Sequence, residues 1–447
     1  ITTDGGNNWA NVTANLPNVP SVSWVTRIHA SQADRGTAYA TIDRHRTDDM
    51  RPYVFKTTNL GESWTNITDN LPEFGFLKVV REDPRNPDVV YVGSEFGLYV
   101  SLSGGGDWVR MNELTGLPPA PVNDILIHPR DNDLIVGTHG RSIWILDDIT
   151  PIQQLASAIE SGPTLFAPLD AIRYEYHFTK PFLGQATFKP SSPLAGALLT
   201  YYLPEAVEDS VQISIEDTDG ELVKTMSASG DQGMQRLTWE LDFQSSPPGG
   251  GFIIHTPAYK VLPGQYRVRL AAAGTESVQP LRVRLDPSLS VSEAELVEQI
   301  NAIKQLVEMR ELADEAIEEI GSVQEQVDDV PELLTNESGD AADTALRLAE
   351  AAHEALEGIR LQLVSELGGY RSATMLRGRI DGLLTALGQA TQRPTDQQTE
   401  WIGTVQGQLQ TVLGELRTVL DSDIHALNQA IEALGIPAIR TNRRPVS

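Results

Sequence analysis

The sequence predicts a multidomain protein: all-β blades of an incomplete propeller over residues 1–150, a β-sandwich with its linker over 151–288, and an antiparallel all-α helical bundle over 289–436. Residues 437–447 are expected to form a tail. Two observations support this division. A short turn motif recurs in the first part at intervals that suit four-stranded sheets. From about residue 290 the composition changes to Ala, Leu, Glu and Gln, with apolar side chains at helical spacing.

The first part contains three copies of the pattern Ser/Thr-x-Asp-x-Gly-x-x-Trp. The third position is occupied by Asp4, Asn59 and Ser103, and the last by Trp9, Trp64 and Trp108. The Trp residues are 55 and 44 positions apart, which suits one four-stranded sheet per copy. We expect the polar side chain to accept hydrogen bonds from backbone N–H groups of the turn. We expect Gly to adopt positive φ and Trp to pack between sheets.

This motif resembles the Asp-box, or bacterial neuraminidase repeat, which is a structural element and does not imply sialidase activity. Residues 1–150 resemble the last blades of sortilin-type and xyloglucanase-type propellers, in bacterial proteins often labelled glycosyl hydrolases. Residues 136–148 resemble the last-blade signature of that group. We count roughly three blades, whereas a closed propeller needs about four or more. The missing blades are therefore expected in an N-terminal part or in a partner chain.

The second part alternates apolar and polar residues, as strands do. From about residue 205 to 285 its pattern resembles the Ig-like domain of flagellar hook-capping proteins, which implies a spacer or docking role. The turn at 217–220, Asp-Thr-Asp-Gly, suggests Ca²⁺ binding, but the later ligands of an EF-hand loop do not follow. A type I′ hairpin is favoured there, and no cofactor is expected.

The third part begins with a capping box formed by Ser292 and Glu295. Four apolar stripes follow within residues 296–307, 345–367, 380–387 and 401–419, and they predict an antiparallel bundle. Residues 290–447 contain 27 acidic and 12 basic residues, and so carry 15 of the 27 excess negative charges. A solvated outer face is favoured, and a docking surface for a basic partner is the alternative.

Charge and composition exclude several classes of function. The net charge of −27 would repel a phosphate backbone, so no nucleic-acid partner is expected. The absence of cysteine excludes disulfides and thiolate metal sites. No apolar run approaches the roughly 20 residues that span a bilayer, so no transmembrane segment is expected. The resemblance implies a secreted, periplasmic or cell-surface location.

Candidate binding residues lie on turns between blade strands, where propellers bind ligands. Three runs occupy equivalent places in successive blades and should share one rim: Asp43-Arg44-His45-Arg46, Glu95-Phe96 and His139-Gly140-Arg141. His139 suits a base or a ligand, Arg141 a clamp for a carboxylate, and Glu95 a carboxylate donor. Alternatively, His139 and Arg141 join turns by bonding to backbone carbonyls.

Two functions remain open at this stage. A non-catalytic scaffold component, which binds a protein or peptide and docks to a larger assembly, is favoured. The alternative is a polysaccharide-active glycoside hydrolase whose catalytic blades lie mostly in a missing N-terminal part. A glycosidase needs two carboxylates about 5 to 9.5 Å apart, and the sequence identifies no such pair. The adjacent Asp147 and Asp148 are expected to form a turn.

Overall fold

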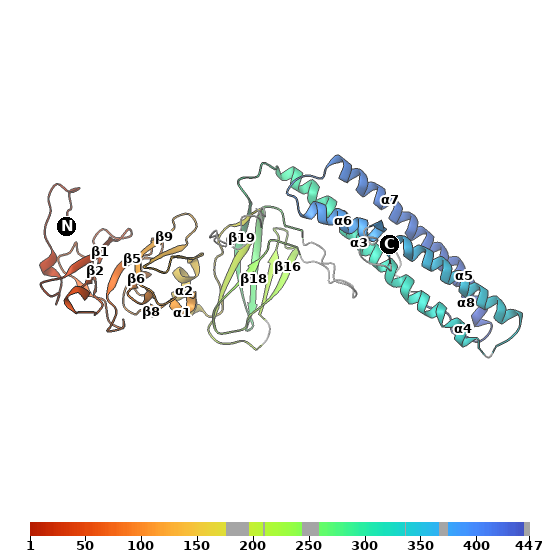
Figure 1. The fold of residues 1–447 in the computed structure, drawn as a ribbon, viewed down its shortest axis with the longest axis horizontal. Helices are drawn as coiled ribbons and strands as arrows, with labels where there is room; N and C mark the ends of the chain where they lie inside the picture. Colours follow the sequence, from red (N-terminus) through yellow and green to blue (C-terminus); the bar gives the residue numbers. More distant parts are fainter. Residues whose placement is uncertain (176–195, 209–210, 244–258, 336, 366–373, 442–447) are drawn as a thin grey trace. The chain divides into compact units, whose positions relative to one another are not determined.

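The computed structural model describes residues 1–175, 196–208, 211–243, 259–335, 337–365 and 374–441 (Figure 1). Contacts divide the chain into two compact units. The first unit comprises residues 1–171, 197–239 and 265–282, and the second comprises residues 172–196, 240–264 and 283–447. The first unit is built mainly of β-sheets and the second mainly of helices. No described helix is long and apolar enough to cross a membrane.

The first unit begins with three antiparallel sheets in which each strand pairs with the next one along the chain. The first sheet follows a short helical turn, η1 (Thr13–Asn15), and contains β1 (Trp24–Ala30), β2 (Ala38–Asp43), β3 (Val54–Thr57) and β4 (Thr65–Asn66). The second contains β5 (Leu77–Glu82), β6 (Val90–Ser94), β7 (Gly97–Ser101) and β8 (Val109–Arg110), followed by α1 (Asn112–Thr115). The third contains β9 (Val122–Ile127), β10 (Leu134–Thr138) and β11 (Ile143–Leu146). The first and second sheets have the four strands that the motif spacing predicts, and the third has three described strands.

The three repeated turns share the same pair of hydrogen bonds. In each copy the hydroxyl at the first motif position accepts a hydrogen bond from the backbone N–H of the fifth position. The polar side chain at the third position accepts one from the backbone N–H of the seventh. The donor–acceptor distances are 2.9 and 2.9 Å for Gly6–Thr2 and Asn8–Asp4, 3.0 and 3.0 Å for Gly61–Thr57 and Ser63–Asn59, and 3.0 and 3.2 Å for Gly105–Ser101 and Asp107–Ser103. The expected capping role of Asp4, Asn59 and Ser103 is confirmed.

The tryptophans that end the motif differ in burial. Trp108 is 5% exposed, and its Nε1–H donates to the Ile67 carbonyl of the preceding sheet at 2.8 Å. Trp64 packs against buried residues of the first sheet. Trp9, however, is 73% exposed, so the prediction that it packs between sheets is wrong. The physical reason is that no described residues offer Trp9 the surface that Ile67 offers Trp108.

The rest of the first unit contains a helix and two further antiparallel sheets. The helix α2 (Thr150–Ser161) is joined to the second and third sheets by Gln153, whose Nε2 donates to Asp83 and Asn132. One further sheet has the order β12-β14-β17 and the other β13-β19-β18-β15-β16. Their strands are β12 (Thr164–Leu165), β13 (Ala171–Arg173), β14 (Ala197–Leu203), β15 (Val211–Glu216), β16 (Leu222–Ala228), β17 (Gly233–Trp239), β18 (Gly264–Ala272) and β19 (Thr275–Leu285).

These two sheets are in contact where Trp239 of β17 meets Tyr266 of β18 edge-on, with ring centroids 5.6 Å apart. The predicted hairpin between β15 and β16 is present, but it is not type I′, because only Gly220 in its turn has positive φ. The Asp217 carboxylate accepts the N–H groups of Asp219 and Glu221 at 3.0 and 2.9 Å. Backbone capping therefore accounts for this acidic turn.

The second unit contains the helices α3 (Glu293–Asp328), α4 (Val330–Leu333), α5 (Asp340–Leu363), α6 (Leu376–Gly388) and α7 (Asp396–Thr418), then a π-helical turn (Val419–Asp423) and α8 (Ile424–Glu432). The capping box at Ser292 is confirmed, and Thr395 forms a second one. Trp401 is exposed rather than part of the fourth stripe. Ile402 takes its place because the buried positions 402, 405, 409, 412, 416 and 419 alternate at spacings of three and four.

The expected tail starts inside the packed bundle. Ile439 is buried among the helices, and its N–H donates to Asn428 at 2.7 Å. The Arg440 N–H donates to Gln326 at 2.9 Å. Residues 442–447 lie outside the described residues.

Candidate functional site at one end of the sheets

The predicted site residues lie on turns between the second and third strands of their sheets. Asp43 ends β2, Glu95 lies between β6 and β7, and His139 and Arg141 lie between β10 and β11. The Glu95 N–H donates to the Phe76 carbonyl at 3.1 Å, and the His139 N–H donates to the Pro121 carbonyl at 2.8 Å. Phe76 directly precedes β5 and Pro121 directly precedes β9, and each of these is the first strand of its sheet. The same end of the sheets, here called the rim, is thus formed by residues 43–53, 72–76, 94–97 and 138–142.

Asp43 and His45 form the most tightly bonded part of the rim. The Asp43 carboxylate faces His45 Nδ1 at 2.7 Å and accepts from Lys78 Nζ of β5, also at 2.7 Å. Burial raises the pKa of Asp43, but the hydrogen bonds from Lys78 and His45 outweigh it, so that pKa lies below its ordinary value. The His45 ring stacks on Phe76 with centroids 4.5 Å apart. Since Nδ1 faces the carboxylate, Nε2 is the ring nitrogen left for another partner.

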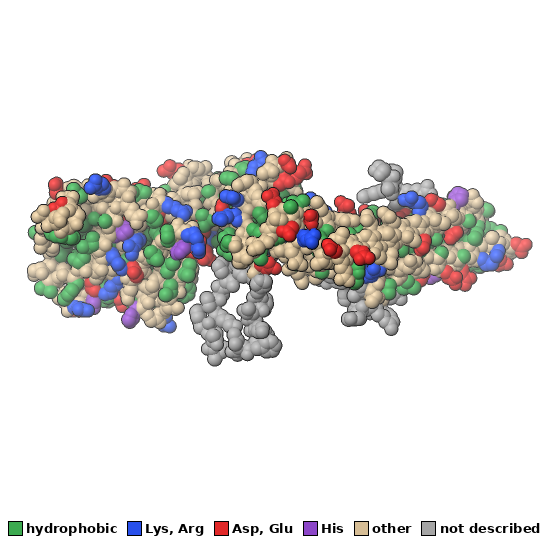
Figure 2. Space-filling model, turned by 90° about the horizontal axis from the view of Figure 1, so that it is seen from above, with side chains coloured by type: hydrophobic (Ala, Val, Ile, Leu, Met, Phe, Trp, Pro, Cys, Tyr) green, Lys and Arg blue, Asp and Glu red, His purple; other side chains and the backbone are tan. Residues whose placement is uncertain are grey.

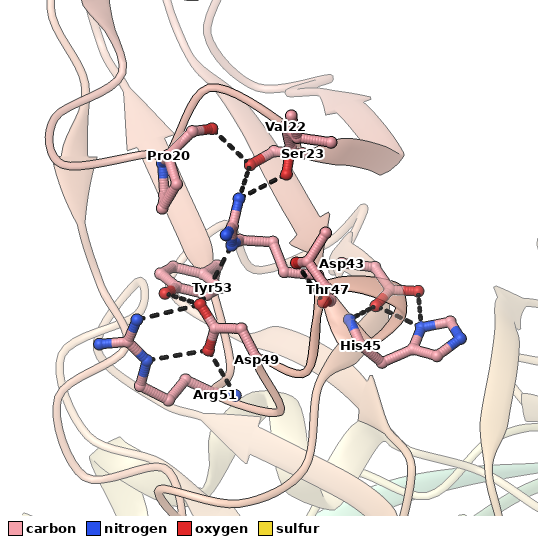
Figure 3. A network of polar contacts seen from close by, with 10 residues as sticks. Pro20, Val22, Ser23, Asp43, His45, Thr47, Asp49, Arg51 and Tyr53 are labelled. Carbon is pink, nitrogen blue, oxygen red and sulfur yellow. Dashed lines mark hydrogen bonds and ion pairs between the residues drawn. The ribbon is translucent and has the colours of Figure 1, made fainter.

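A second network fixes the loop that follows (Figure 3). Asp49 accepts from Arg44 Nε at 3.0 Å, from Arg51 Nε and Nη2 at 2.9 and 3.0 Å, and from the Tyr53 hydroxyl at 2.8 Å. The bonded Arg51 guanidinium is the largest cause that holds the pKa of Asp49 well below its ordinary value. The Arg44 guanidinium also bonds Val22 and Ser23, which lead into β1. These contacts connect the loop to the segment that precedes β1.

Two phenylalanines lie beside these networks. Phe96 belongs to the Glu95-Phe96 turn that the sequence indicated, whereas sequence reasoning missed Phe74. Phe74 and Phe96 stack with centroids 5.8 Å apart, yet they are 59% and 38% exposed. The Gly75 N–H between them and the loop donates to the Met50 carbonyl at 2.8 Å. A Cβ added at Gly75 would come within 3.2 Å of the Phe96 ring. The absence of a side chain at Gly75 therefore lets the backbone of residues 72–76 lie close to the Phe96 ring.

The other predicted residues are placed differently. The side chains of Glu95, His139 and Arg141 make no hydrogen bond or ion pair with any described residue, and both His139 and Arg141 are exposed. Neither basic side chain bonds a backbone carbonyl, which was the alternative role. The structure therefore joins Asp43 and His45 directly, connects Glu95 to them through Phe76, and leaves His139 and Arg141 on the adjoining turn.

A further cluster on the first strands was also missed. Arg27 of β1 and Arg81 of β5 both bond Asp124 of β9, at 2.8 and 3.3 Å. His29 lies beside Arg81, at 3.4 Å from Nδ1 to Nη1. Burial is the largest cause that lowers the pKa of His29 to about 4, and the charges of Arg81 and Arg27 add to it. Up to 97 positions separate these residues, so no local motif indicates the cluster.

Two carboxylates of the rim are not tuned to donate a proton near neutral pH. A glycosidase acid needs a raised pKa, whereas Asp43 and Asp49 both have lowered ones. Among the described residues no group of three or more His, Asp or Glu side chains could hold a metal ion. In the view of Figure 2, the part of the chain that contains the three sheets exposes hydrophobic side chains together with Lys, Arg and His.

Comparison with known proteins identifies no family for this chain. No family model matches it, and no curated protein does. Its likenesses among solved structures include a GH74 enzyme from Niastella koreensis (13% identity, TM-score 0.24, covering 57% of this chain and 30% of that one). They also include an ancestral GH74 enzyme (13%, 0.21, 58% and 35%) and YCF48 from Cyanidioschyzon merolae (14%, 0.20, 60% and 73%). The chain spans about a third of the length of the two GH74 enzymes. At these TM-scores the likenesses carry no argument about fold or function.

Proposed function

We propose that this chain is a non-catalytic binding component of an exported scaffold protein, and that its rim binds a protein or peptide. The observation that carries the proposal is the Phe74–Phe96 pair, whose rings stack on each other and yet remain exposed. Large aromatic side chains are enriched in interfaces and supply much of their binding energy. A fixed pair of them on a surface is therefore a natural anchor for a partner.

The ion pairs around this anchor support the same function. Asp49 holds Arg44, Arg51 and Tyr53 in place, and Asp43 holds His45 and Lys78. A surface that is already ordered loses little conformational entropy when a partner binds. The rim thus offers apolar contact area beside charged groups whose positions are fixed, which gives orientation as well as affinity.

The other parts fit a scaffold. We propose that the three sheets are blades of an Asp-box propeller, that the paired sheets form an Ig-like spacer, and that the helical unit docks to a larger assembly. The repeated turn bonds support the first point, and the facing of Trp239 and Tyr266 supports the second. The acidic excess of residues 290–447 supports docking to a basic partner.

Selection of displayed peptides on the immobilised chain tests the binding function. Peptides that the wild-type protein enriches are measured against Phe74→Ser and Phe96→Ser. The control is Leu114→Ser, since Leu114 is 72% exposed on α1 and lies outside the rim. We expect at least about tenfold weaker binding to both Phe variants and unchanged binding to the control. Peptides that bind all four proteins equally would show that the rim is not the site.

The hydrolase alternative has its own test. The protein is incubated with xyloglucan, other β-glucans and sialosides, and released reducing sugar or sialic acid is measured. We expect no turnover. Turnover by the wild-type chain that disappears in Glu95→Gln would overturn the non-catalytic assignment, because Glu95 is a rim carboxylate that makes no ion pair with the described residues.

A further inference from the structure

The outer edge of the third sheet is left open by the strands that the structure describes. In the first and second sheets, β4 and β8 pair with the outer edges of β3 and β7. In the third sheet, β11 pairs with β10 alone, and the chain then continues into α2 at Thr150. Among the described strands, none pairs with the other edge of β11.

Comparison of the second and third sheets shows what this open edge exposes. Tyr99 faces Val92 in the β6–β7 pair, and Trp144 faces Val136 in the β10–β11 pair, so β7 and β11 have matching registers. Leu98, Tyr99 and Val100 are 1%, 7% and 7% exposed. Their counterparts Ile143, Trp144 and Ile145 are 68%, 36% and 58% exposed. The apolar side chains of β7 are therefore buried, whereas those at the matching positions of β11 are exposed.

The fourth strands that are present define what fits such an edge. Val109 and Arg110 of β8 face Val100 and Tyr99, and both are exposed. The flanking Trp108 and Met111 are buried, and the Met111 N–H donates to the Leu98 carbonyl at 2.9 Å. In the first sheet, the Ile67 N–H likewise donates to the Val54 carbonyl at 3.0 Å. Both strands follow the pattern Trp-x-x-aliphatic.

The surface next to β11 has matching chemistry. A cavity of about 40 Å³ opens between the second and third sheets, and its walls are mainly apolar. Trp144, Ile145 and Leu146 of β11 line one side, and Leu98, Leu117 and Val136 are among the residues on the other sides. Buried side chains of a fourth strand would extend these walls.

We propose that the edge of β11 is a docking site for an antiparallel β-strand of another polypeptide with the pattern Trp-x-x-aliphatic. The backbone of that strand continues the hydrogen-bond ladder of the third sheet, and its aromatic and aliphatic side chains cover the exposed edge. The site is separate from the rim and does not depend on the function proposed for it. The pairing register of β4 and β8 gives the expected alignment.

A labelled synthetic peptide with the sequence of residues 101–112, which contains β8, is the probe, and its fluorescence anisotropy is measured with the full chain. Ile145 corresponds to Val100, so its N–H faces away from β10 toward the incoming strand. Ile145→Pro removes that donor, whereas the matched Ile145→Thr keeps it. We expect saturable binding, at least about tenfold weaker with Ile145→Pro and within about threefold of wild type with Ile145→Thr.

A second measurement decides the matter if the proline variant does not fold. The same peptide with an N-methyl group on the amide of Met111 cannot donate to the Ile143 carbonyl, and should bind the wild-type protein at least about tenfold more weakly. No binding, or equal binding of the two peptides, would refute strand addition. If light scattering shows a dimer that Ile145→Pro dissociates, a second copy occupies the edge and the proposal of a different polypeptide is wrong.

Discussion

The repeated tryptophans allow a direct test of how neighbouring sheets are held together. Trp108 is 5% exposed and donates to the Ile67 carbonyl at 2.8 Å, whereas Trp9 occupies the same motif position and is 73% exposed. Replacement of a buried Trp by Ala costs about 3–5 kcal/mol. The Ile67 carbonyl also loses its donor, which adds about 1 kcal/mol. Trp9→Ala should cost less than about 0.5 kcal/mol, since most of its surface is already in water.

Residue-resolved amide hydrogen exchange is the suitable assay, because a chain of several domains does not unfold in a single step. In Trp108→Ala the amides of β3, β7 and β8 should exchange faster by a factor that corresponds to about 3 kcal/mol or more. Exchange in α3 and α5 should not change. Trp9→Ala should leave all of these rates unchanged. Equal effects of the two substitutions would refute the view that Trp108 holds the first and second sheets together.

Three other perturbations have defined outcomes. The pKa of His29 is lowered to about 4, so on acidification the unfolded chain is protonated at this ring before the folded chain is. The free energy of unfolding of the sheets should therefore fall by about 3 kcal/mol as the pH decreases from 6.5 to 4. Amide hydrogen exchange measured over that range should lose this pH dependence in His29→Gln. Asp49→Asn should destabilise residues 43–53 by about 1–3 kcal/mol at pH 7. Because the pKa of Asp49 is lowered, the stability difference between wild type and Asp49→Asn should disappear only as the pH falls from 3.8 through that lowered pKa. Thr395→Ala removes the N-terminal cap of α7 and should cost the bundle about 1 kcal/mol in urea unfolding followed by helical circular dichroism.

Local chemistry explains what could be predicted from the sequence. The polar side chain at the third position of each motif bonds within its own turn, so Asp4, Asn59 and Ser103 form the same contact wherever the turn lies. The helices were predictable for the same reason, since a stripe at spacings of three and four depends on neighbours along the chain. The candidate residues 95, 139 and 141 lie between the second and third strands of their sheets, a position that follows from strand order alone.

Contacts between distant residues explain what could not be predicted. Burial of a motif Trp depends on the preceding sheet, and the motif itself is the same for Trp9 and Trp108. Phe96 lies on a turn that the sequence indicated, but no local pattern shows that its ring stacks on Phe74 from the segment before β5. Arg27 and Asp124 are 97 positions apart, and their pairing requires the first strands of successive sheets to lie next to each other.

The two proposed sites should respond differently to salt, because they use different interactions. The rim places the charged side chains of Arg51 and Glu95 near its aromatic anchor, and contacts of a ligand with exposed charges weaken as ionic strength rises. The β11 edge binds through neutral backbone groups and apolar side chains, whose attraction salt does not screen. An increase from 50 mM to 500 mM NaCl should therefore weaken peptides selected on the rim and leave the residue 101–112 peptide unaffected. Equal weakening of both would mean that charged groups outside β11 bind the residue 101–112 peptide. Backbone hydrogen bonds to β11 would then not be its main interaction.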